Sequence, residues 1–209
     1  MWILPYIITG ILIGICLKRV AIYLIDQREK NVVYGHLLNK GISWLYWSAF
    51  TAGIYGVIGS LPISFPNKLE YMVLSSICLC IAMVDFKIKK IPNELLIALI
   101  VNRIFFLAII HDLKAITLSL VGMIAGFIIF LLPSYLKMNI GGGDIKFGAV
   151  VGFCLGVYNF FEVMIIMAAA LAILTVYLIA SKRGTLKTQA AMGPFIALGV
   201  IITIIFPLF

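Results

Sequence analysis

Long apolar stretches run along the whole chain and are separated only by short segments that carry charge. Of the 209 residues, 64% are hydrophobic and 11% are charged, whereas a soluble domain is about half apolar and about a quarter charged. Such a chain is predicted to be an integral membrane protein. Because the apolar excess leaves no stretch for a separate soluble domain, residues 1–209 are predicted to form a single polytopic unit.

A helix that crosses the hydrocarbon core of a bilayer needs about 20 apolar residues. On this basis the protein is predicted to be all-α, with about eight transmembrane helices. Basic residues, and not a small-residue cleavage site, follow the first apolar stretch, so it is predicted to be a retained span and not a signal peptide. The approximate ranges of the helices are 2–17, 42–62, 69–86, 94–111, 115–136, 144–159, 161–180 and 194–209.

The basic residues are distributed unevenly between alternate loops. Thirteen lie in or beside the loops after the first, third, fifth and seventh helices, and only Lys68 and Lys114 lie in the loops between them. Because loops rich in Lys and Arg stay in the cytoplasm, both termini are predicted to face outside. The first cytoplasmic loop, 18–41, is short, and residues 21–25 either extend the first helix or lie in the interface. The net charge of +8 thus reflects topology, and no nucleic-acid partner is expected.

The cysteines and the loop histidine offer no metal site. All four cysteines lie inside apolar stretches, and none has the paired spacing of a zinc site. They are interpreted as small apolar side chains within helices, and His36, in the first loop, as a solvated residue. The cysteines are Cys16, Cys78, Cys80 and Cys154.

Two of the eight acidic residues, Asp85 and Asp144, fall at predicted cytoplasmic helix ends. Two carboxylates held close together do not both ionise readily, so one keeps its proton. The ionised one can take a proton from water while the other donates to a carbonyl oxygen, as in aspartic proteases. The residues alone leave three readings open: a catalytic pair, an ion or proton site in a transporter, or structural roles in helix capping and pairing with lysines.

The remaining charged residues near or within helices have structural interpretations. Glu70 and Glu162 are placed near the outer side and read as solvated or capping charges. Asn93 is expected to cap the helix 94–111, with Glu94 favouring the helix dipole from its first turn. Arg103, which lies inside that helix, is expected to form a structural pair or to reach toward the interface.

Three glycines, Gly141, Gly142 and Gly143, directly precede Asp144. Because glycine has no Cβ, a peptide backbone can approach such a segment closely. Lys146 lies two residues beyond Asp144 and does not share its helix face, so it is interpreted mainly as a membrane-surface anchor.

At these positions the chain resembles the type IV prepilin peptidases, which are membrane aspartic proteases of the Gly-x-Gly-Asp class. The family pattern is an aspartate shortly before Ile-Pro-Asn, here Asp85 with Ile91-Pro92-Asn93, and then Gly-x-Gly-Asp-x-Lys, here 141–146. The segment 192–199, beginning Met-Gly-Pro-Phe, is similar to the family's closing segment. The resemblance covers roughly residues 70–205.

The resemblance implies a substrate, a chemistry and a location. Asp85 and Asp144 would be catalytic, and Gly141, Gly142, Gly143, Lys146, Pro92 and Asn93 would surround them. The protein would remove the short basic leader from prepilins or pseudopilins at the cytoplasmic face of a prokaryotic plasma (inner) membrane. A presenilin-like protease uses a similar glycine-aspartate motif, but the chain has no Pro-Ala-Leu segment and no tyrosine before Asp85.

The chain departs from many bacterial members of that family in its first loop. Those members carry two Cys-x-x-Cys pairs there and methylate the new N-terminus with S-adenosylmethionine. Residues 18–41 contain no cysteine. We therefore expect neither zinc nor S-adenosylmethionine as a cofactor, and no N-methyltransferase activity.

Overall fold

The computed structural model describes residues 3–29, 43–135, 141–181 and 191–207. These residues form helices and no strands, which confirms the all-α prediction. Five of the helices, α1, α3, α4, α5 and α6, are long and apolar enough to cross a membrane. The helices are α1 (Leu4–Arg28), α2 (Ser43–Ser60), α3 (Phe65–Ile88), α4 (Asn93–Ile110), α5 (Leu113–Tyr135), α6 (Gly142–Ala180) and α7 (Gly193–Ile205).

The first helix is longer than predicted. The expected end at residue 17 is wrong, because α1 continues without interruption to Arg28. Residues 18–28 contain neither glycine nor proline, and Ala21, Leu24 and Ile25 are buried against α3. Burial of this apolar face stabilises the extra helical turns, and the alternative of an interfacial segment at 21–25 is excluded.

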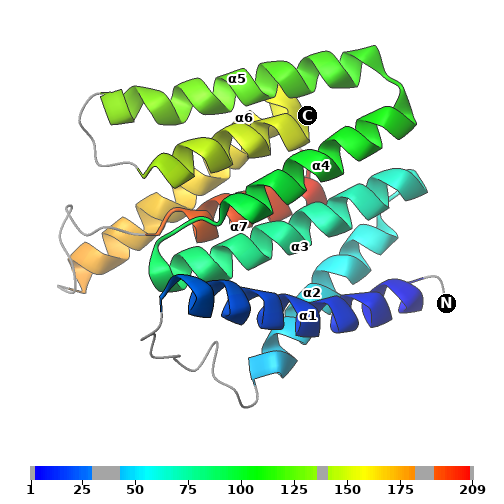
Figure 1. Cartoon of the computed structure of the whole chain (residues 1–209), viewed down its shortest axis with the longest axis horizontal. Helices are drawn as coiled ribbons and strands as arrows, with labels where there is room; N and C mark the ends of the chain where they lie inside the picture. Colours follow the sequence, from blue (N-terminus) through cyan, green and yellow to red (C-terminus); the bar gives the residue numbers. More distant parts are fainter. Residues whose placement is uncertain (1–2, 30–42, 136–140, 182–190, 208–209) are drawn as a thin grey trace.

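A sharp turn divides α6 into two arms. Gly156 has φ 78° and ψ 170°, a conformation that is available to glycine and strained for other residues. In Figure 1 the yellow-green beginning and the orange end of α6 lie on the same side of the molecule, so the chain turns back on itself. The predicted helices 144–159 and 161–180 correspond to these arms, with the break at Gly156 instead of residue 160.

The ends of the helices separate into two groups (Figure 1). The ends of α1 and α3 lie at the left of the view with the beginnings of α4, α6 and α7, whereas α1 begins and α7 ends toward the opposite side. The helix ends beside the lysine- and arginine-rich loops therefore share one side of the molecule. This arrangement matches the alternation of the basic residues on which the predicted topology rests.

Close contacts between glycines join α5 to the first arm of α6. A Cβ on Gly122 would lie 2.2 Å from the carbonyl oxygen of Gly152, and one on Gly126 would lie 2.3 Å from that of Gly148. Small residues four apart on both helices let the backbones approach directly, as is common in membrane helix pairs. This packing fixes the arm that begins next to Asp144.

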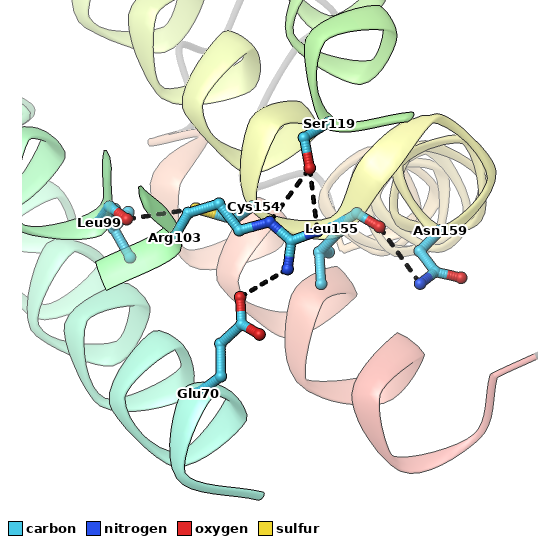
Figure 2. Close-up of polar contacts among 7 residues, drawn as sticks. All are labelled: Glu70, Leu99, Arg103, Ser119, Cys154, Leu155 and Asn159. Carbon is cyan, nitrogen blue, oxygen red and sulfur yellow. Dashed lines mark hydrogen bonds and ion pairs between the residues drawn. The ribbon is translucent and has the colours of Figure 1, made fainter. Parts of the chain in front are cut away.

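A buried ion pair between Glu70 and Arg103, together with hydrogen bonds to Ser119, joins α3, α4 and α5 (Figure 2). It lies near the start of α3, whereas Asp85 lies near the end of that helix. The Arg103 guanidinium donates to Glu70 Oε1 at 2.7 Å and, through two of its nitrogens, to Ser119 Oγ at 3.1 and 2.9 Å. The structural pairing expected for Arg103 is confirmed. The solvated reading of Glu70 and Glu162 is wrong, because both are almost fully buried. Their helices pack inside the bundle, where a carboxylate requires a partner.

Candidate active site

Asp85 lies in the last turn of α3 and is 4% exposed. The backbone N–H of Gly193, at the start of α7, donates to its Oδ2 at 2.8 Å. Lys89 then ends α3 in a left-handed conformation, with its N–H donating to the Asp85 carbonyl at 2.8 Å. Two helices that are distant in sequence therefore fix the orientation of this carboxylate.

Asp144 lies in the first turn of α6, three residues after the N-cap Gly141. Its backbone N–H donates to the Gly141 carbonyl at 3.0 Å, and its side chain is half-buried. A carboxylate in the first helical turn is stabilised by the free N–H groups and the helix dipole. The Asp144 carboxyl group also accepts a hydrogen bond from the backbone of Gly141, so its side chain does cap the start of α6, and this role is compatible with a place in the site.

One cavity of about 440 Å³ brings the two aspartates together. The two carboxyl groups are near enough to interact electrostatically. Most residues of the predicted site line this cavity, including all three glycines, Lys146 and Asn93. Pro92 is the N-cap of α4 and does not line it. The complete lining is Asp85, Lys89, Lys90, Ile91, Asn93, Gly141, Gly142, Gly143, Asp144 and Lys146.

Lys146 and Asn93 connect the two sides of this cavity. Lys146 Nζ donates to Asn93 Oδ1 at 3.4 Å, so α6 and α4 are linked beside the aspartates. The prediction that Asn93 caps α4 is wrong, because Pro92 occupies that position and Asn93 is the first helical residue. Glu94 forms an ion pair with Arg28 at the end of α1 and does not line the cavity.

Four residues of the site were not predicted from the sequence: Gly193, Lys89, Lys90 and Ile91. Gly193 was part of a recognised segment, but nothing in the local sequence links it to Asp85, which is 108 residues away. The two lysines were interpreted only as loop charges that indicate the membrane topology, and they were not predicted to line the cavity. Within the described part of the chain, no three side chains among His, Cys, Asp and Glu lie close enough together to hold a metal ion.

Comparison with known proteins defines the class. Residues 72–208 match the type IV leader peptidase family, and this range contains both aspartates, the glycine segment and Gly193. The chain therefore belongs to the type IV leader peptidase family. It is 33% identical over 198 aligned residues to the prepilin leader peptidase/N-methyltransferase of Bacillus subtilis (strain 168), covering 86% of this chain and 72% of that protein. No solved structure matches the chain.

Proposed function

We propose that this protein is a membrane aspartic endopeptidase that removes the leader from type IV prepilins or pseudopilins at the cytoplasmic face of a prokaryotic plasma membrane. The observation that supports it most directly is the cavity that Asp85 and Asp144 share. Members of this family are leader peptidases, and the cavity is lined by two carboxyl groups that can serve as acid and base.

The proposed reaction uses one ionised and one protonated aspartate. The ionised carboxylate takes a proton from water as the water oxygen attacks the scissile carbonyl carbon, and the protonated one donates its proton to the carbonyl oxygen. Collapse of the tetrahedral intermediate breaks the C–N bond, and the leaving amine takes up a proton from the pair. Because the two carboxyl groups share one cavity, the roles of acid and base are proposed for the pair and not for either residue alone.

The surroundings of the pair suit a peptide substrate. The Gly193 N–H holds Oδ2 of Asp85 in a hydrogen bond and so fixes the orientation of this carboxyl group in the cavity. The glycines at 141–143 leave room for an extended backbone beside Asp144. The lysines of the cavity would not attract a basic leader, so recognition rests on short-range contacts.

We propose further that cleavage needs neither zinc nor S-adenosylmethionine, since the aspartates supply the acid and base and residues 18–41 contain no cysteine. Cleavage by the purified protein is expected to proceed at an unchanged rate in excess EDTA. Intact-mass analysis of the product is expected to show no added methyl group. Loss of activity in EDTA that zinc restores would contradict the first expectation, and a methylated product would contradict the second.

Proteoliposomes containing the purified protein test the function against a transporter. The proposal predicts shortening of an added prepilin and no ion or proton flux above that of empty vesicles. Transport sites lie typically near the bilayer midplane between broken helices, whereas Asp85 and Asp144 lie at helix ends. Flux without cleavage would favour the transporter, and cleavage within a membrane span instead of at a leader junction would favour a presenilin-like protease.

Replacing Gly193 with alanine is expected to displace Asp85. A Cβ at this position would lie 2.8 Å from Asp85 Oδ2 and 2.9 Å from its Cβ, so the aspartate or the start of α7 must move. Misplacement of a catalytic group by about 1 Å costs up to about 100-fold in rate. We expect kcat for prepilin cleavage to fall by about 10- to 100-fold, and a variant with wild-type kcat would show that this contact is dispensable.

The three glycines before Asp144 are expected to differ in their tolerance of alanine. A Cβ on Gly141 would lie 3.1 Å from Asp144 Oδ2 and one on Gly143 would lie 3.2 Å from Ile91 Cβ, whereas one on Gly142 meets nothing within 4 Å. Gly142→Ala should therefore cleave within about twofold of wild type, and Gly141→Ala should lose about tenfold because the carboxylate must rotate. Equal losses in the two variants, measured as kcat, would contradict this.

A further inference from the structure

A second cavity, of about 510 Å³, lies between α2, α3 and α7. Every residue that lines it is apolar or glycine. Along α7 it extends from Pro194 to Ile205, a length of about 16 Å at the rise of an α-helix. This apolar groove therefore follows roughly half the thickness of a hydrocarbon core of about 30 Å.

The groove begins beside the candidate active site. Pro194 directly follows Gly193, whose N–H holds Asp85. On α3, Ala82 lines the groove one helical turn before Asp85. A chain lying in the groove would thus leave it next to the catalytic pair.

The lining of the groove favours a helix as its occupant. Small residues occupy all three walls: Ala49 and Gly53 on α2, Ala82 on α3 and Ala197 on α7. In membranes, small side chains at a surface let another helix backbone approach closely, and packing contacts drive the association. An uncharged lining excludes the basic leader itself. The part of the substrate that fits is apolar and helical.

By the family resemblance, the prepilin substrate carries an apolar helix directly after its leader. We infer that this apolar groove binds that helix and so places the leader junction at Asp85. This inference rests on the proposed function and adds a docking site to it. The leader would remain on the side of Lys89 and Lys90, while the apolar helix would lie along α7 within the membrane. Specificity for the membrane segment would then be separate from the chemistry at the aspartates.

Filling the groove tests the inference. Gly53 lines it, and a side chain there would meet no protein atom within 4 Å of its Cβ, so Gly53→Leu narrows the groove without a clash at Cβ. Two substrates are compared: a full-length prepilin and a peptide that spans the junction but ends before the apolar helix. We expect KM for the prepilin to rise about tenfold and cleavage of the short peptide to stay unchanged. Ala108→Leu, on an exposed face of α4, should change neither.

A photocrosslinking residue supplies an independent measurement. Placed at Leu198 in the groove, it should capture the apolar helix of the prepilin, and placed at the exposed Phe105 of α4 it should not. An unchanged KM in Gly53→Leu, equal losses with both substrates, or crosslinks to lipid alone at Leu198 would each overturn the inference. Failure of the wild-type protein to shorten either substrate would instead refute the proposed function.

Discussion

Replacing Asp85 or Asp144 with asparagine is expected to abolish leader removal while the protein still inserts and folds. Asparagine keeps the shape of the side chain but can neither take a proton from water nor share one with its partner. Because both steps of the proposed reaction need the pair, each single variant should lose at least about a thousandfold in rate. In Asp85→Asn the amide oxygen can still accept the hydrogen bond from Gly193, so the local fold is retained.

Asp26→Asn is the matched control, because it removes a carboxylate of the same type from an exposed position near the end of α1. It should cleave at the wild-type rate. All three variants should be recovered from membranes in equal amounts and elute as the wild type does in detergent. If either Asp85→Asn or Asp144→Asn cleaved at the wild-type rate, the paired mechanism would be wrong.

Breaking the buried pair between Glu70 and Arg103 is expected to produce the largest loss of stability. The two side chains are 3% and 11% exposed, and Arg103→Met would leave the Glu70 carboxylate without its charge partner inside the bundle. Such a loss destabilises by about 3–5 kcal/mol, which lowers Tm by on the order of 10 °C in a chain of this length. Thermal unfolding in detergent, followed by circular dichroism, measures the change.

The double variant Glu70→Leu/Arg103→Met distinguishes the destabilisation caused by an unpaired buried charge from that caused by altered packing. Because it removes both buried charges, it should regain most of the lost Tm. The exposed pair between Arg28 and Glu94 gives the control, and Glu94→Gln should change stability by less than about 1 kcal/mol. Equal Tm values for Arg103→Met and the wild type would show that the buried pair contributes nothing.

Features with a local signature were predicted well from the sequence. Apolar length located the helices, and the alternation of lysine and arginine placed Asp85 and Asp144 on the same side of the membrane. Both aspartates do line one cavity. A structural pair for Arg103 could be expected, although not the identity of its partner, because a guanidinium inside an apolar helix requires one.

Features that depend on packing between distant segments were not predicted. The hydrogen bond from Gly193 to Asp85 joins residues 108 positions apart, and no spacing rule connects them. The break between the two arms of α6 was predicted near residue 160, but its exact position at Gly156 was not, since hydropathy does not report backbone dihedrals. Glu70 and Glu162 looked solvated because position along a helix does not reveal which face is buried.

The most direct test of the central claim is the intact mass of a prepilin incubated with the purified protein and, in parallel, with its Asp144→Asn variant. The prediction is a product from the wild-type reaction that is lighter by the mass of the leader, and an uncut prepilin from the variant reaction. An unchanged mass with folded wild-type protein, or the same shortened product from both proteins, would contradict the proposal that Asp85 and Asp144 form the catalytic pair of a leader peptidase.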